Sequence, residues 1–163
     1  MLSLPVIYNA MFPISGSKIE PYLEQHLGVH GVKIVKTIDI DNKKIVLYEF
    51  STDYKKLLGD AELTRGITNK YKFNRTGYNQ SIVRNRILET SRGKYLLVIG
   101  ENREGKLGFI QAAVRETIFT GNIPSEEYFA FTFSLPKHTV GNFADLILLK
   151  SKSGTIVYEN NIY

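Results

Sequence analysis

The sequence predicts an α+β fold that is predominantly antiparallel β, with one N-terminal helix packed on a hairpin and a small β-sandwich-like set of strands after it. Residues 15–28 have apolar side chains at helical spacing, and residues 94–100 form a continuous apolar run of strand length. Phe129, Phe131 and Phe133 alternate with small or polar residues. This alternation places three aromatic rings on one face of a strand.

The helix predicted within residues 15–28 has identifiable ends. Ser17 and Glu20 have the spacing of a capping box, in which each side chain accepts a hydrogen bond from a backbone N–H at the start of the helix. Pro21 still lies in the first turn, where proline is tolerated. Gly28 is the residue type that commonly ends helices.

Residues 32–50 are predicted to form a β-hairpin, because two runs rich in Val and Ile flank a turn at Asp41 and Asn42. The next segment, 51–66, follows neither the helical nor the strand period clearly. The sequence leaves open whether it is a further strand or a short helical turn.

The second half of the chain has the clearest β pattern. The run at 94–100 is apolar after Lys94, as expected of a central strand, and a polar turn at 101–106 follows it. The last predicted hairpin turns at 151–154. We therefore expect a single domain over residues 1–163, with a soft division near residues 60–90 between the helix-and-hairpin half and the C-terminal β half.

The first 15 residues are apolar and uncharged, and two interpretations of them stay open. The stretch is too short to span a bilayer, which takes about 20 apolar residues, and Pro5 and Pro13 argue against a continuous helix. One interpretation is an N-terminal strand docked on the core. The other is the end of a membrane anchor or signal whose upstream part is missing from this chain.

Positive charge is concentrated in one part of the chain. The net charge is +5, and residues 64–97 contain eight Lys or Arg and a single acid, Glu89. Such asymmetry indicates attraction to an anionic partner without identifying it. The absence of cysteine excludes disulfides, thiolate metal sites and cysteine nucleophiles.

No group of residues in the sequence indicates a reaction. His26 and His30 have the spacing of a helical metal pair, but Gly28 between them is expected to end the helix. Acidic pairs such as Asp39 and Asp41 lie in or near predicted turns, where carboxylates are normally solvated and poorly suited to acid–base catalysis. We therefore predict no enzyme activity, no cofactor and no metal site.

The basic segment contains the predicted anion-binding residues. If residues 81–88 form a strand, Arg84 and Arg86 lie on one face about 7 Å apart. This spacing suits bidentate contacts with neighbouring phosphates or carboxylates. The further candidates for contact with an anion are Lys70, Lys72 and Arg75.

Aromatic residues are interleaved with these charges. Tyr71 and Tyr78 are candidates for stacking on bases or sugars. An ordinary basic strand surface explains the same pattern, since Lys and Arg are normal on sheet surfaces and Phe73 is a normal core residue.

Three stretches, residues 19–50, 94–114 and 123–136, resemble parts of small extracytoplasmic proteins of low-GC Gram-positive bacteria. Many proteins of that group are tethered by a signal-anchor or a lipid. The resemblance implies an extracytoplasmic, membrane-tethered location, and it carries over no functional residues. The charged leader and the lipid-receiving cysteine that such proteins often have are not found in this sequence.

We therefore expect a non-enzymatic, envelope-associated binding or protein-interaction module whose basic segment faces an anionic surface or an acidic protein. The alternative is a cytoplasmic nucleic-acid-binding domain that uses the same basic and aromatic residues. The sequence contains no helix-turn-helix, zinc or RNP-type motif that would favour this alternative.

Overall fold

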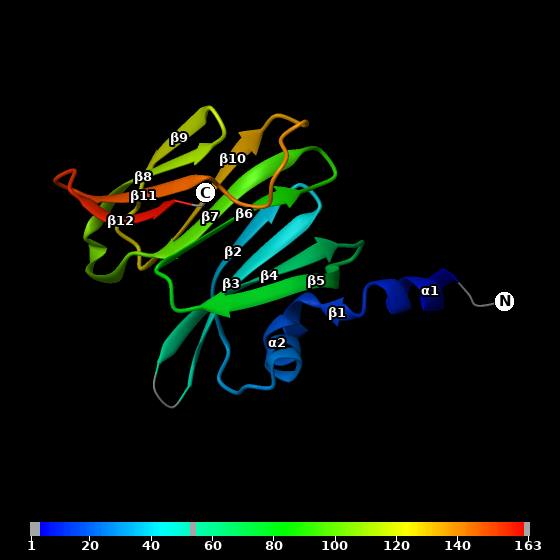
Figure 1. The fold of residues 1–163 in the computed structure, drawn as a ribbon. Helices are drawn as coiled ribbons and strands as arrows, with labels where there is room; N and C mark the ends of the chain where they lie inside the picture. Colours follow the sequence, from blue (N-terminus) through cyan, green and yellow to red (C-terminus); the bar gives the residue numbers. More distant parts are fainter. Residues whose placement is uncertain (1–3, 53–54, 162–163) are drawn as a thin grey trace. The chain divides into compact units, whose positions relative to one another are not determined.

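The computed structural model describes residues 4–52 and 55–161 (Figure 1). The chain divides into two compact units, residues 1–81 and 82–163, and each unit is described by itself. Every paired strand in either unit runs antiparallel to its neighbours within the described residues. The fold is therefore mostly antiparallel β, as the sequence predicts.

The N-terminal unit combines helices with one five-stranded sheet. In chain order its elements are α1 (Leu4–Met11), β1 (Ile14–Ser15), the 3-10 helix η1 (Gly16–Lys18), α2 (Ile19–Leu27), β2 (Lys33–Ile40), β3 (Lys43–Ser51), β4 (Lys56–Arg65) and β5 (Lys70–Asn79). The sheet order is β1-β5-β4-β3-β2. The long strands thus follow one another as a meander, and β1 adds a short edge beside β5 (Figure 1).

Helix α2 ends where the sequence predicts but begins differently. Gly28 follows the helix at φ 67°, a left-handed conformation that glycine adopts readily. The predicted capping box is wrong, because Ser17 lies in η1 and Lys18 is the N-cap residue, without a side-chain hydrogen bond. Glu20 instead accepts a hydrogen bond from the backbone N–H of Ile34 at 2.9 Å, which joins the helix to β2.

Residues 4–11 form helix α1 although two prolines lie nearby. Pro5 is in the first turn, where its missing N–H has no helical partner to lose. The helix ends at Met11, before Pro13. Between residues 4 and 15, strand structure is confined to Ile14–Ser15, which pairs with the start of β5.

The predicted hairpin is formed by β2 and β3, and its turn is Asp41–Asn42, with Asp41 at φ 52°. The segment 51–66, which the sequence leaves open, contains strand β4. All residues of β4 from Leu57 to Leu63 are buried. Because both faces of this strand are covered, it lacks the alternation that identifies a half-exposed strand.

One face of the sheet carries the apolar core of the N-terminal unit. Ile19 and Leu23 of α2 share a cluster of buried side chains with Val46 and Tyr48 of β3 and with residues of β4 and β5. Tyr48 is fully buried, and its hydroxyl lies 2.7 Å from that of Thr76 on β5. This hydrogen bond satisfies a polar group that would otherwise be costly to bury.

The C-terminal unit contains two antiparallel sheets, with strand orders β10-β7-β6 and β12-β11-β8-β9 (Figure 1). Its elements are β6 (Val83–Glu89), β7 (Lys94–Glu101), the 3-10 helix η2 (Arg103–Gly105), β8 (Leu107–Val114), β9 (Thr117–Asn122), β10 (Tyr128–Leu135), β11 (Leu146–Ser151) and β12 (Ile156–Asn161). The apolar run at 94–100 is central in its sheet, as the sequence predicts.

Buried side chains from both sheets form one apolar cluster in the C-terminal unit. Phe129 of β10 is fully buried and lies opposite Gly100 of β7 in the strand register. The rings of Phe129 and Phe131 have centroids 5.9 Å apart, and those of Phe131 and Phe133 are 5.8 Å apart. These distances confirm the predicted aromatic face of this strand.

Candidate anion-binding surfaces

The basic residues predicted to bind an anion are divided between the two units. Lys70, Lys72 and Arg75 lie on β5 of the N-terminal unit, and Arg84 and Arg86 lie on β6 of the C-terminal unit. The five predicted residues therefore do not belong to one unit.

The three basic residues of β5 lie on one face of its sheet. Lys72 pairs with Thr64 and Arg75 with Glu62, and a β-bulge between these pairs brings both bases to the same side despite their odd spacing. Lys72 and Arg75 are exposed, and neither forms an ion pair with any residue that the structure describes. Both charges are accordingly accessible to an external anion.

The two tyrosines proposed for stacking project to the opposite face of β5. Tyr71 is 3% exposed, belongs to the buried cluster beside α2, and donates a hydrogen bond to Asn69 Oδ1 at 2.7 Å. Tyr78 is 48% exposed, and its ring meets that of Phe50 edge to face at a centroid distance of 5.0 Å. The basic and aromatic side chains of this strand therefore do not form one continuous surface.

The strand predicted around residues 81–88 is β6, on which Arg84 and Arg86 project to one face. They pair with Ile99 and Leu97 of β7. Arg84 is half-buried, and Arg86 is 5% exposed. Contact between an anion and these two arginines stays a prediction, and they are less exposed than Lys72 and Arg75.

Asp39 forms ion pairs with two further cations of the N-terminal unit. Its Oδ1 lies 2.5 Å from Arg65 Nη2 and 2.9 Å from Lys44 Nζ. Although burial raises the pKa of Asp39, the hydrogen bonds and charges of Lys44 and Arg65 outweigh this effect and hold the pKa below its ordinary value. Lys44 Nζ also lies 5.7 Å from the centroid of the Tyr71 ring. These two cations are engaged inside the unit.

Exposed apolar side chains lie on α1 and on the turn between β4 and β5. Ile67 of this turn is 73% exposed, and Ile7 and Met11 of α1 are 46% and 55% exposed. We call Ile7, Met11 and Ile67 the apolar end. Large apolar side chains that gather on a surface often mark an interaction site.

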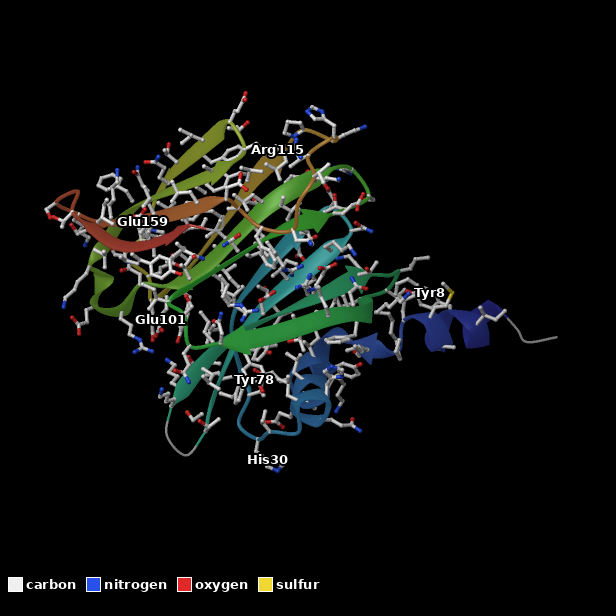
Figure 2. The ribbon with its side chains drawn as sticks, viewed as in Figure 1. Tyr8, His30, Tyr78, Glu101, Arg115 and Glu159 are labelled. Atoms are coloured by element: carbon white, nitrogen blue, oxygen red, sulfur yellow. The ribbon has the colours of Figure 1, made fainter. Side chains whose placement is uncertain are left out.

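Helix α1 is held against this turn by specific contacts. The hydroxyl of Tyr8 donates a hydrogen bond to the backbone carbonyl of Ile67, and Figure 2 shows Tyr8 where the helix meets the turn. The rings of Tyr8 and Phe12 stack with centroids 5.1 Å apart. They press so closely on Gly66 that a Cβ added there would lie 2.5 Å from the Tyr8 hydroxyl. Since β5 begins directly after this turn, Lys70 lies next to the apolar end.

Turns at one end of the C-terminal unit enclose two hollows. One, of about 310 Å³, lies between the β8–β9 turn and the segment after β10, and its lining includes Arg115, His138 and Thr139. The other, of about 220 Å³, is lined by the β6–β7 turn, residues 89–94, and by Lys137. Figure 2 shows Arg115 at this end of the unit and Glu101 at the opposite end.

No motif in the sequence marks the residues of these hollows as a site. Arg92 and Lys94 lie within the basic segment, but Lys137 comes from a turn far along the chain. The pairing of β10 with β7, in which Leu135 is opposite Lys94, brings the two turns together. No local spacing in the sequence encodes such a juxtaposition.

Within residues 4–52 and 55–161, no group of three or more His, Cys, Asp or Glu side chains is placed to hold a metal ion. No helix in this part of the chain is long and apolar enough to cross a membrane. Comparisons with protein-family models, with curated proteins and with solved structures find no match to the chain. Its function is therefore inferred from the geometry of these surfaces.

Proposed function

We propose that this chain is a non-enzymatic, envelope-associated binding module whose N-terminal unit docks on an anionic lipid surface. The observation that carries the proposal is the apolar end, whose Ile67 is 73% exposed in the turn that leads into Lys70 and Lys72 at the start of β5. The extracytoplasmic location implied by the sequence resemblance is part of the same proposal.

The two kinds of side chain act together at a lipid surface. Apolar groups enter the boundary between headgroups and acyl chains, and Lys or Arg near the surface contributes about 1 kcal/mol each through attraction to anionic lipid. Asp39 lies near this end of the sheet, but its charge is already compensated by Lys44 and Arg65. Lys70 and Lys72 therefore dominate the charge that a membrane would meet.

Single-stranded nucleic acid is the alternative partner, and the exposed ring of Tyr78 is the observation that favours it. Nucleic-acid binding of this kind combines stacking on aromatic rings with a basic groove that follows the backbone. Lys72 and Arg75 project to the other face of β5, so these two bases do not share a surface with the ring of Tyr78.

Co-sedimentation with phosphatidylcholine vesicles, with and without phosphatidylserine, tests the proposal. Lys70→Gln with Lys72→Gln removes about 2 kcal/mol of attraction, so binding to the anionic vesicles should weaken about 30-fold at low salt. Lys33→Gln with Lys152→Gln is the matched control, because these exposed lysines lie elsewhere and the change in charge is the same. An equal loss in both variants would show that only net charge matters.

A second pair of variants tests the apolar contribution. Met11→Asn with Ile67→Asn should weaken binding, whereas Ile118→Asn with Ile156→Asn should not, although Ile118 and Ile156 are 62% and 52% exposed. Binding to neutral vesicles as strong as binding to anionic ones would contradict the proposal. Displacement of the protein from vesicles by single-stranded DNA would favour nucleic acid instead.

We also infer a finer architecture for the two units. A helix packed on the first hairpin and on the rest of the meander is supported by the buried cluster that α2 shares with β3, β4 and β5. A small β-sandwich is supported by the single cluster to which both sheets of the C-terminal unit contribute. Hydrogen exchange slowest at the amides of β3, β4 and β7 is the expected experimental signature.

A further inference from the structure

One end of the C-terminal unit is assembled from the ends of three neighbouring strands. β6 ends at Glu89 and β7 begins at Lys94, and these two residues pair with each other. β10 ends at Leu135, which pairs with Lys94 from the other side. The β6–β7 turn and the segment that leaves β10 are therefore adjacent, although they are far apart in the sequence.

The segment that follows β10 is fixed along β6 (Figure 1). The backbone N–H of Ile87 donates to the carbonyl of Asn142 at 2.7 Å. The side chain of Asn85 accepts a hydrogen bond from the N–H of Ala144, also at 2.7 Å. These bonds give the segment a defined position next to the β6–β7 turn.

Lys94 lines the hollow of about 220 Å³ and joins the two segments around it. Its Nζ donates a hydrogen bond to the backbone carbonyl of Thr139 at 2.9 Å, and Thr139 is only 5% exposed. Thr139 N–H in turn donates to Pro136 O at 3.0 Å, which closes a tight turn around Lys137. These bonds fix the backbone of the turn that carries Lys137, which lines the hollow together with the β6–β7 turn.

The charge of this hollow is predominantly positive. Its lining carries the cations Arg92, Lys94 and Lys137 and one acid, Glu89. The turn is rigid, because the Thr90 hydroxyl donates to Gly93 O at 3.0 Å and accepts from Gly93 N–H at 3.1 Å. An excess of cations around one hollow attracts anions.

We propose that this hollow binds one tetrahedral oxyanion of the phosphate class. Arg92 supplies a planar fork of donors, and the two lysines supply compact charges, which is the combination that phosphate oxygens accept. The volume lies below the several hundred Å³ that sites for whole small molecules usually have. The hollow therefore suits a phosphate group, free or at the end of a larger molecule. This site is independent of the proposed lipid docking by the N-terminal unit.

Calorimetric or NMR titration of the full chain with inorganic phosphate tests the inference. We expect saturable binding with one site, and a loss of affinity of about tenfold or more for each charged donor removed in Arg92→Gln with Lys137→Gln. Lys33→Gln with Lys152→Gln is the charge-matched control and should bind phosphate as the wild type does. Lys137→Glu provides a second variant in case the double variant does not fold.

Further ligands separate the sources of the phosphate group. Glycerol 3-phosphate presents a monoester and glycerophosphoglycerol a diester of the kind found in headgroups and wall polymers. Tighter binding of the monoester supports a soluble phosphate ligand, and tighter binding of the diester supports a headgroup or polymer. The inference is overturned if phosphate does not saturate a site, if acetate binds equally well, or if the Arg92 and Lys137 variants bind unchanged.

Discussion

Substitution of Gly100 by alanine tests the packing of the C-terminal unit directly. A Cβ at this position would lie 2.3 Å from Cζ of Phe129 and 2.7 Å from the backbone carbonyl oxygen of Ile82. Phe129 is fully buried, so its ring cannot move aside without disturbing the cluster around it. Overpacking a core usually costs about 1–3 kcal/mol. Because backbone must shift here as well, we expect Gly100→Ala to lower the free energy of unfolding by about 3 kcal/mol.

Urea unfolding followed by far-UV circular dichroism measures this loss. Gly93→Ala is the matched control, because nothing lies within 4 Å of a Cβ built there. This change should be neutral or stabilise the protein by up to about 1 kcal/mol, because alanine lowers the conformational entropy of the unfolded chain. If Gly100→Ala were as stable as the wild type within about 0.5 kcal/mol, Phe129 could not be packed over Gly100 as described.

Three further predictions concern individual side chains and the helix end. Asp39→Asn should cost about 1 kcal/mol or less at neutral pH, as is usual for a half-exposed ion pair. Because folding lowers the pKa of Asp39, the difference in free energy of unfolding between the wild type and Asp39→Asn should persist above about pH 4 and disappear as the pH falls below it. Urea unfolding curves at several pH values measure this difference. A difference that grew on acidification would contradict the ion pairs of Asp39. Gly28→Ala should destabilise the protein by about 1–2 kcal/mol in the same assay, because an L-residue is strained at φ 67°; an unchanged midpoint would show that the helix does not end in this conformation. Asn102 is 1% exposed; its side chain accepts a hydrogen bond from Leu107 N–H at 2.9 Å and donates one to Pro124 O at 2.8 Å. Asn102→Leu should therefore lower the free energy of unfolding by about 2–3 kcal/mol and accelerate hydrogen exchange of the Leu107 amide. Unaltered exchange would exclude the bond between Leu107 N–H and Asn102.

Local signals in the sequence located turns and helix ends, because those structures depend on a few adjacent residues. The turn at Asp41 and the helix end at Gly28 both require the left-handed backbone that their residue types tolerate. The capping box failed because Ser17 entered a 3-10 turn and Glu20 bonded across to the backbone of Ile34. A local sequence pattern cannot show that a backbone group farther along the chain, here Ile34 N–H, will bind a side chain that could cap a helix.

The weak periodicity of β5 has a physical cause in its bulge. Phe73 pairs with Leu63 and Thr76 pairs with Ala61, so residues three apart share one face of the sheet. The bulge interrupts the period-two pattern of β5. Spacing alone therefore cannot show that Lys72 and Arg75, which lie on either side of the bulge, share one face of the sheet.

The candidate sites could be predicted only in part for a related reason. The sequence indicated the exposed bases Lys72 and Arg75, because charge concentration is visible without a fold. It could not indicate that Ile67 would be exposed in a turn against α1, or that Arg92 and Lys137 would line one hollow. These are contacts between elements, which depend on strand order and register.

Lipid docking of the N-terminal unit is tested most directly by placing a fluorescent reporter at its apolar end. The chain contains no tryptophan, so Ile67→Trp introduces a single indole at a side chain that is 73% exposed. The matched control is Ile118→Trp, at a side chain that is 62% exposed in the C-terminal unit. We predict that vesicles containing phosphatidylserine shift the emission of the Ile67→Trp protein to the blue and that brominated lipid quenches it, while the control is unaffected. Unchanged emission at position 67, or equal shifts in both proteins, would contradict docking through the apolar end.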